Sequence, residues 1–213
     1  MLTRRQTALI VHALLLIGAL AYVVPLLTAW NSQTGYLAAL LLYWLGFCLP
    51  VMTFHVWPLR GPRLFSEKLA WRDWFVPGLL LMQVGIVAIL VFVPNTPMLT
   101  TRGAMLAAAI AMINAPLEET AWRGGFMTVF AGRPQLGFWM AWGLFTAWHG
   151  PLLLSHGLVF DGGWPALVGG AAVLGLVWSW LAWRTGSVFW VTIAHGLTNA
   201  ITFWVLFDRN GFV

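Results

Sequence analysis

Charged residues are scarce in this sequence, and their scarcity excludes a soluble domain. Of the 213 residues only 8% are Asp, Glu, Lys or Arg, whereas 61% are hydrophobic. A soluble domain of this length has no core large enough to bury so much apolar surface. The basic residues are scattered through short segments between apolar runs, although the formal net charge is +5. This scatter is typical of a polytopic membrane protein and not of a nucleic-acid-binding surface.

Cysteine and several catalytic motifs are also missing. The single Cys48 lies in an apolar run, which excludes an internal disulfide and a metal–thiolate cluster. The chain contains no His-Glu-x-x-His motif and no Gly-rich phosphate loop. No Ser stands in a polar setting near His149 or His195, so a serine hydrolase is unsupported.

Long apolar runs are plentiful and predict an all-α protein with about seven transmembrane helices. About 20 apolar residues are enough to cross the hydrocarbon core as a helix. The expected spans are 8–30, 36–57, 74–93, 103–126, 136–154, 164–183 and 187–207. The segment Ala19-Leu20-Ala21 resembles a signal-peptide cleavage site, but the first run continues past it and fits a retained span better. We expect one integral membrane domain over residues 1–213, with three spans in 1–101 and a four-helix catalytic core in 102–207.

The basic residues predict the orientation of these spans. With a cytoplasmic N-terminus, the residues facing the cytoplasm are Arg4, Arg5, Arg60, Arg63, Lys68, Arg72, Arg133 and Arg184, and those facing outside are Arg102 and Arg209. Cytoplasmic loops carry an excess of Lys and Arg, so this arrangement is favoured. We expect a multi-pass protein of the plasma (cytoplasmic) membrane. Its basic cytoplasmic loop, residues 58–73, forms either an interfacial helix or a solvated loop.

Two adjacent acids and an arginine interrupt the fourth apolar run. Glu118, Glu119 and Arg123 stand where each ionised side chain costs a few kcal/mol in hydrocarbon, which indicates a functional site. Pro116 removes a backbone donor, and Gly124-Gly125 loosens the helix, so we expect a kink before the acids and an irregularity after them. The structural alternative is a buried ion pair that fixes helix packing.

Spacing along the helices favours the functional interpretation. At 1.5 Å per residue the two acids lie roughly 15–20 Å from the cytoplasmic face, and His149 lies at a similar depth. His195 lies roughly 13 Å from the same face. Three helices therefore bring titratable side chains to one layer of the membrane.

Helical periodicity suggests different roles for the two acids. Glu119 and Arg123 are four residues apart with the acid first, the favoured order for an ion pair. Glu118 points about 100° away from Glu119 and is free to face a different neighbour. We therefore expect Arg123 to neutralise Glu119, which leaves Glu118 for chemistry.

The two histidines each share a helix face with a second side chain. Phe145 and His149 are four residues apart, as are His195 and Asn199. A face that carries both His and Asn offers two hydrogen-bond donors at one level. Such a pair suits the stabilisation of a developing oxyanion.

In this combination the residues resemble the CPBP family of intramembrane endopeptidases, named for CAAX proteases and bacteriocin-processing enzymes. The family pattern is Glu-Glu-x-x-x-Arg, then Phe-x-x-x-His, then His-x-x-x-Asn or Asp. The matching residues are Glu118, Glu119 and Arg123, then Phe145 and His149, then His195 and Asn199. The resemblance covers the last four spans and does not extend to the first three.

The resemblance implies hydrolysis of a peptide bond by a glutamate-activated water, with a membrane-associated protein or peptide as substrate. It assigns the base to the first glutamate, Glu118, in agreement with the periodicity. The family includes proteases of prenylated proteins, bacteriocin self-immunity proteins and proteases linked to protein sorting. We expect catalytic roles for Glu118, His149, His195 and Asn199, supporting roles for Glu119, Arg123 and Phe145, no cofactor, and a chamber open toward the cytoplasmic half of the bilayer.

Two alternatives remain at this stage. Glu118 or Glu119, His149 and His195 form a carboxylate and two-histidine set that suits one zinc ion. A non-catalytic immunity or transport protein is the alternative of a different class, because it can use the same polar cluster for binding or proton relay. Besides the substrate, the only expected partner is the lipid bilayer, and no nucleic acid is expected.

Overall fold

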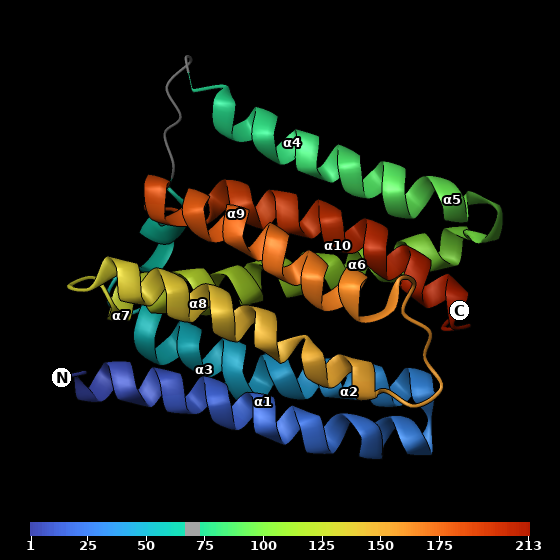
Figure 1. Cartoon of the computed structure of the whole chain (residues 1–213), viewed down its shortest axis with the longest axis horizontal. Helices are drawn as coiled ribbons and strands as arrows, with labels where there is room; N and C mark the ends of the chain where they lie inside the picture. Colours follow the sequence, from blue (N-terminus) through green and yellow to red (C-terminus); the bar gives the residue numbers. More distant parts are fainter. Residues whose placement is uncertain (67–72) are drawn as a thin grey trace.

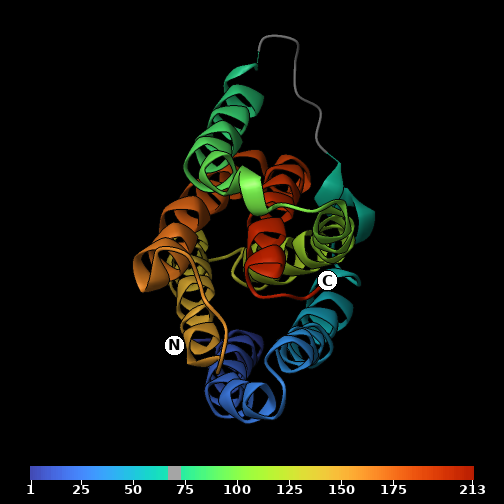
Figure 2. The same ribbon diagram turned by 90° about the vertical axis from the view of Figure 1, so that its right-hand side faces the viewer.

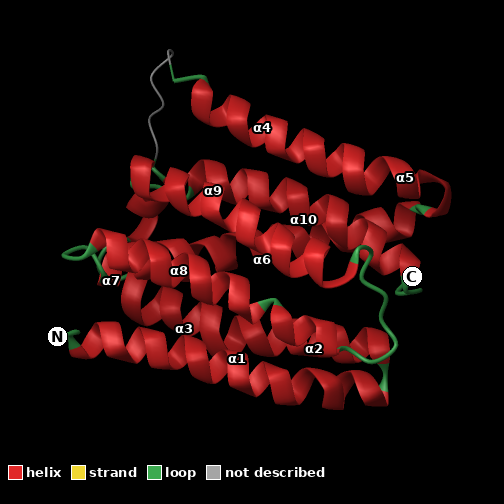
Figure 3. Ribbon diagram, viewed as in Figure 1, coloured by secondary structure: helices red, strands yellow, loops and turns green. Residues whose placement is uncertain are grey.

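The chain folds into long helices that run side by side, as the apolar runs predict. The computed structural model describes residues 1–66 and 73–213, and within these ranges it contains helices and loops but no β-strand (Figures 1 and 3). This confirms the all-α class of a polytopic membrane protein.

The helices follow each other in two groups along the chain. The first group is α1 (Arg4–Trp30), α2 (Ser32–Tyr43), a π-helical turn (Trp44–Cys48), α3 (Leu49–Val51), a second π-helical turn (Met52–Val56), a 3₁₀ turn (Gly61–Phe65), α4 (Phe75–Val87), a π-helical turn (Ala88–Phe92), α5 (Val93–Asn95) and a 3₁₀ turn (Thr96–Met98). The second group is α6 (Thr101–Glu118), a π-helical turn (Glu119–Gly125), α7 (Phe126–Val129), α8 (Pro134–Trp148), a 3₁₀ turn (Gly150–Leu154), a π-helical turn (Pro165–Gly169), α9 (Gly170–Thr185) and α10 (Phe189–Arg209).

Five continuous helices in the described part of the chain are long and apolar enough to cross a membrane. They are Arg4–Trp30, Ser32–Val56, Phe75–Met98, Pro165–Thr185 and Phe189–Arg209. The other two expected spans correspond to α6–α7, which carries the charged motif, and to α8, which has only 15 residues. These two less regular helices carry most of the motif residues.

The first hairpin shows how local sequence sets the helix ends. Asn31 interrupts the helix in an extended conformation, and its side chain accepts a hydrogen bond from the Thr34 amide at 2.9 Å. Such capping satisfies a backbone donor that has no partner within the helix. Gly35 then allows α2 to approach α1, because a Cβ at this position would collide with the Leu27 backbone.

All of the long helices run between the same two ends of the bundle. The N-terminal end carries residue 1 and the turns near residues 131–133 and 186, and the C-terminal end carries the turns near residues 31 and 99, the loop 155–163 and residue 213 (Figure 1). Viewed from the C-terminal end, α10 lies in the middle of the bundle and packs along α6 and α4 (Figure 2). Because α10 has neighbouring helices on several sides, several of its side chains lie in the interior of the bundle.

The basic segment predicted at residues 58–73 is only partly described. Its first part forms the 3₁₀ turn Gly61–Phe65, in which Leu64 is fully buried and its carbonyl accepts a hydrogen bond from Val188 N at 2.9 Å. Residues 67–72, which include Lys68 and Arg72, lie outside the described residues. The choice between an interfacial helix and a solvated loop therefore stays a prediction.

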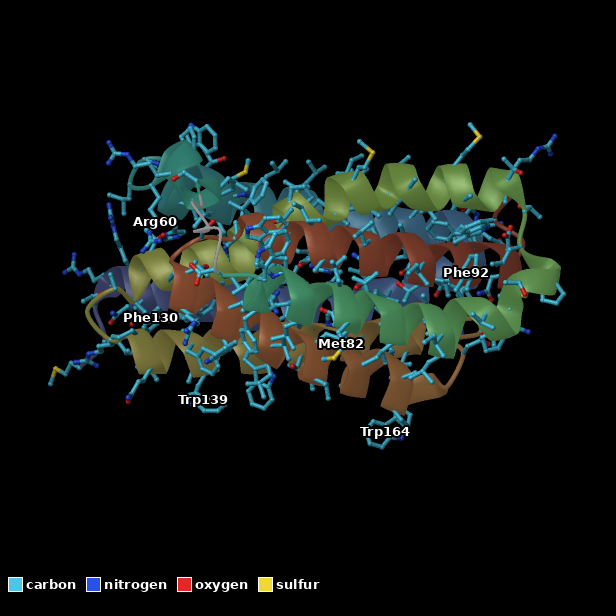
Figure 4. All side chains as sticks on the ribbon, turned by 90° about the horizontal axis from the view of Figure 1, so that it is seen from above. Arg60, Met82, Phe92, Phe130, Trp139 and Trp164 are labelled. Carbon is cyan, nitrogen blue, oxygen red and sulfur yellow. The ribbon has the colours of Figure 1, made fainter. Side chains whose placement is uncertain are left out.

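Large apolar side chains cover the outside of the bundle. Met82, Trp139 and Trp164 project outward, and more than half of the surface of each is exposed (Figure 4). Trp139 belongs to the N-terminal half of α8, and Trp164 precedes the π-helical turn that leads into α9. Tryptophan is enriched where a membrane meets water, so these positions agree with a bundle surrounded by lipid.

Candidate functional site

The acidic motif lies on a widened helical turn in the interior of the protein. The α-helix α6 ends at Glu118, and the next residues, Glu119–Gly125, continue it as a π-helix before α7 begins. Isolated π-helical turns are frequent at functional sites, although the described part of this chain also has four others outside the motif. The expected irregularity after the acids is thus present, although the helix continues without a break to Val129. Glu118, Glu119 and Arg123 are at most 1% exposed.

Arg123 is enclosed by hydrogen-bond acceptors from two helices. Its Nη1 donates to Glu119 Oε1 at 3.0 Å, which confirms the predicted ion pair. From α9, Ser179 Oγ accepts from Nε at 3.3 Å and the Gly175 carbonyl accepts from Nη2 at 3.2 Å. A buried charge is tolerated only when its donors are satisfied in this way.

Aromatic rings complete the enclosure of this guanidinium. The Arg123 Cζ atom lies 3.9 Å from the centroid of the Phe145 ring and 5.7 Å from that of Trp178. A cation over an aromatic face gains electrostatic stabilisation, and more so when both are desolvated. The Phe of the second motif therefore supports the Arg of the first motif, which is a contact between two different helices.

His195 connects the two glutamates. Its Nδ1 lies 2.7 Å from Glu119 Oε1, and its Nε2 lies 3.6 Å from Glu118 Oε2. Because Glu119 is also paired with Arg123, its carboxylate accepts hydrogen bonds from both neighbours, and Nδ1 of His195 carries the hydrogen. The His195 ring is stacked on Trp178, with centroids 4.3 Å apart, which fixes its orientation.

This geometry changes the role expected for His195. A neutral imidazole has one N–H group, and here that group donates to Glu119. The Nε2 atom, which faces Glu118, donates to an oxyanion only when the ring carries both protons. The sequence did not predict the bond between Glu119 and His195, because it joins residues on two helices that are far apart in the chain.

His149 is oriented by its own helix. Its Nδ1 lies 2.8 Å from the Phe145 carbonyl oxygen, which only accepts, so Nδ1 carries the hydrogen and Nε2 has a free lone pair. The ring also makes an edge contact with the Phe145 ring, with centroids 4.8 Å apart. The four-residue spacing of the second motif thus provides both an acceptor and a ring for the same histidine.

One cavity brings the predicted catalytic residues together. This inner cavity, of about 80 Å³, is lined by Tyr36, Leu40, Asn114, Glu118, Trp148, His149, Leu152, Leu167, His195, Asn199, Thr202 and Phe203. Glu118, His149, His195 and Asn199 are all among them, as the sequence predicts. Glu118 Oε2 and Glu119 Oε2 are both buried without a hydrogen-bond partner among the described residues, but only Glu118 lines the cavity. A buried polar atom left without a partner is costly, and a catalytic role is one reason for such an atom to be retained.

The inner cavity extends in the direction opposite to the one expected. Thr202 and Phe203 follow His195 on α10 toward the C-terminal end of the bundle, and Tyr36 lies one turn from the start of α2 at that same end. The sequence predicts a chamber open toward the end that carries the basic segments. On that side the fully buried Trp122, Arg123 and Phe126 occupy the space next to the acids.

The hydrogen bonds of the two site histidines bear on the predicted zinc set. Among the described residues, no group of three or more His, Cys, Asp and Glu side chains is placed to hold a metal ion. His195 directs Nδ1 to Glu119, and His149 directs Nδ1 to a backbone carbonyl. Both rings therefore keep Nε2 for another neighbour, as metal-binding histidines also do. Glu118, His149 and His195 line one cavity, and the zinc alternative stays a prediction.

Several supporting residues lie outside the motifs and were not predicted. Trp178 donates through Nε1 to Gln83 Oε1 at 2.7 Å, and Gln83 Nε2 donates to Thr198 at 2.9 Å, so one polar side chain of α4 connects α9 to α10. Asn114 accepts a hydrogen bond from Trp44 Nε1 at 2.7 Å. A polar residue in the middle of an apolar span, such as Gln83, is the signal that could have identified the first of these bridges.

Fold and site together define an integral membrane protein with a buried Glu–His–Arg cluster next to an internal cavity. Residues 100–201, which carry all three motifs, match the family model described as type II CAAX prenyl endopeptidase Rce1-like. The match confirms the resemblance seen in the motifs. No curated protein and no solved structure matches the chain. The family is one of proteases, which supports a peptidase acting at the membrane.

Proposed function

We propose that the protein is an intramembrane endopeptidase in which Glu118 activates water to hydrolyse a peptide bond of a membrane-associated protein or peptide. The observation that carries this proposal is the position of Glu118. Its carboxylate is buried, has one oxygen without a hydrogen-bond partner, and lines the same cavity as His149, His195 and Asn199. General-base catalysis requires such a carboxylate beside a space that admits water and substrate.

The first step uses Glu118 and His149. Glu118 takes a proton from the water, whose oxygen then attacks the carbonyl carbon of the peptide bond. His149 Nε2 has a free lone pair, because Nδ1 donates to the Phe145 carbonyl, and it accepts the second hydrogen of the water. Two acceptors for one water fix the direction of attack, which lowers the entropic part of the barrier.

The second part of the reaction stabilises and then breaks the tetrahedral intermediate. The Asn199 side-chain amide donates to the oxyanion, and His195 donates through Nε2 when it carries both protons, a state that the Glu119 carboxylate stabilises through Nδ1. Glu118 returns its proton to the amine nitrogen, and the C–N bond breaks. The products are a carboxylic acid and an amine, and the acid then loses its proton to give a carboxylate.

A comparison of membrane proteomes tests the proposal. Cells that express the Glu118→Gln variant should accumulate an uncut membrane protein that cells with the wild-type protein convert to two fragments. Asp73→Asn is the matched control, since Asp73 is an exposed acid outside the site. Identical proteomes for wild type and Glu118→Gln would contradict a peptidase and favour an immunity or transport protein.

A further inference from the structure

A second cavity lies at the C-terminal end of the bundle. This outer cavity, of about 160 Å³, is lined by Tyr36, Val91, Val159, Phe160, Asp161, Ala166, Leu167, Thr202, Phe203, Val205, Leu206 and Arg209. It is bounded by α10, by the π-helical turns that follow α4 and precede α9, and by the loop 155–163. It is the larger of the two cavities.

The two cavities adjoin each other. Tyr36, Leu167, Thr202 and Phe203 line both of them. A chain that enters the outer cavity therefore contacts residues that also line the cavity of Glu118 and His195. The ring of Tyr36 is held at this boundary by a tilted contact with Phe160 and an edge contact with Phe212, with centroids 6.3 and 6.0 Å apart.

The loop that forms one wall is fixed to the end of α10. Asn210 Oδ1 accepts a hydrogen bond from Val159 N at 2.7 Å, and Asn210 Nδ2 donates to the Val159 carbonyl at 3.0 Å. Arg209 Nη2 lies 3.1 Å from Asp161 Oδ2 and donates to Asn95 Oδ1 at 2.6 Å. The charges at the rim thus neutralise each other.

The chemistry of the lining selects the occupant. Most of the lining side chains are aliphatic or aromatic, and the two charged ones, Arg209 and Asp161, are paired. A charged segment would lose its hydration here without gaining a partner, whereas an apolar segment gains the free energy of burial. Binding sites with an apolar wall and a few polar groups are typical of specific recognition.

We propose that the outer cavity is the binding site for an apolar, uncharged segment of the substrate polypeptide, which reaches Glu118 from the C-terminal end of the bundle. The inference rests on the proposed peptidase function and names its substrate class and its direction of approach. The packed residues Trp122 and Phe126, both fully buried, occupy the other side of the acids.

Thiol protection tests the binding site without requiring cleavage. In a Cys48→Ala, Glu118→Gln background the only thiol is one introduced at Thr202, in the wall shared by the cavities. The Thr202→Cys variant is labelled with a charged methanethiosulfonate reagent in detergent. The probe is a leucine–alanine peptide of about ten residues, which spans roughly 33 Å when extended. At about ten times its Kd the peptide should slow labelling about tenfold, as simple occupancy requires.

Two controls give the result its meaning. A peptide of equal length with alternating lysine and glutamate should leave the labelling rate unchanged. Val173→Cys, which lies on α9 with 65% of its side chain exposed, should be labelled at the same rate with and without the apolar peptide. Absence of protection at Thr202→Cys, or equal protection at Val173→Cys, would overturn the proposal.

A blocking variant tests the route. Leu152→Cys places a thiol in the wall of the inner cavity and reports on access to it. Ala166→Trp adds a large side chain at an exposed position of the outer cavity. This side chain should slow the labelling of Leu152→Cys about tenfold, because it lowers the fraction of molecules in which the reagent can pass through the outer cavity. Val173→Trp is the control and should have no effect. Unchanged labelling of Leu152→Cys in the Ala166→Trp variant, with an unchanged melting curve, would overturn the route. Both assays measure access and binding, so they fail or succeed independently of the Glu118→Gln proteome comparison.

Discussion

The two adjacent glutamates differ in their partners, and this difference sets their roles. Glu119 is held by Arg123 at 3.0 Å and by His195 at 2.7 Å, whereas Glu118 faces the cavity and approaches His195 Nε2 only at 3.6 Å. The Glu119 oxygen that holds Arg123 and His195 is already occupied by hydrogen bonds, whereas Glu118 is directed to the cavity where a water can bind. Helical spacing predicted the ion pair of Glu119, but not its bond to His195.

Arg123→Ala should lower stability as well as activity. The substitution leaves the buried Glu119 carboxylate without its cationic partner, and it removes the guanidinium that packs on the face of the Phe145 ring. Removal of one partner of a buried pair costs about 3–5 kcal/mol. Melting curves in detergent measure the loss of stability. Arg123→Lys serves as a control that keeps the positive charge but lacks the planar guanidinium with its several N–H donors. A variant that is inactive yet as stable as wild type would show that Arg123 acts on the substrate instead.

Activity should survive the removal of metal ions. Glu118, His149 and His195 have separate hydrogen-bonding roles in the proposed mechanism, and none of these roles requires a metal. We expect chelator-treated protein to cleave its substrate at the untreated rate and purified protein to contain well under one zinc per chain. Stoichiometric zinc, with activity lost on chelation and restored by zinc, would support the metallopeptidase alternative.

At the scale of the elements, α9 is shaped to receive the π-helical turn of the motif. Gly175, Trp178 and Ser179 are spaced three and four residues apart and lie on one face of α9. Gly175 and Ser179 supply acceptors to Arg123, and Trp178 stacks on His195. The element that supports the site therefore carries none of the three motifs.

Gly175→Ala tests this support. A Cβ at this position would lie 3.0 Å from Phe145 Cδ1 and 3.2 Å from Arg123 Nη2, which is closer than ordinary packing. We expect a loss of about 1–3 kcal/mol in the free energy of unfolding, the usual cost of overpacking. Gly170→Ala, on the same helix with no atom within 4 Å of the new Cβ, should be neutral or slightly stabilising. Equal stability of the two variants would contradict the close contact.

The sequence predicted the motif helices because the helical period fixes the spacing of residues within each motif. It predicted in the same way that Glu118, His149, His195 and Asn199 lie around one site. It did not identify Gln83, Gly175 or Trp178, because each is a single residue in an apolar run without a set spacing from the motifs. The direction of the cavity was also not predictable. Helical rise gives the depth of Glu118 in the membrane, but the space beside it depends on packing between helices, here on Trp122 and Phe126.

At the scale of the whole molecule, most of the basic residues and the outer cavity lie at opposite ends. Arg4, Arg60, Arg133 and Arg184 lie at or next to helix ends at the N-terminal end of the bundle, whereas the outer cavity, with the paired Arg209 and Asp161, is at the C-terminal end. Basic loops favour the cytoplasmic side of a membrane. The arrangement therefore gives the molecule a predicted orientation that labelling can test.

Single cysteines at the two ends should report this orientation. In a Cys48→Ala background, His156→Cys lies in the exposed loop at the C-terminal end, and Ala131→Cys lies at the N-terminal end. An impermeant maleimide should label His156→Cys on intact cells and Ala131→Cys only after the membrane is opened. The reverse pattern would place the N-terminus outside, against the charge distribution.

The central claim is that Glu118, and not Glu119, is the base. Its most direct test is single-turnover cleavage, in proteoliposomes, of the protein that accumulates uncut in cells carrying Glu118→Gln. We expect Glu118→Gln to lower the rate by about 10²–10⁴, the range of general-base catalysis, while its melting temperature stays at the wild-type value. Glu119→Gln should lower the melting temperature, because it weakens the bonds to Arg123 and His195. A near-wild-type rate for Glu118→Gln, together with a stable but inactive Glu119→Gln variant, would assign the base to the other glutamate.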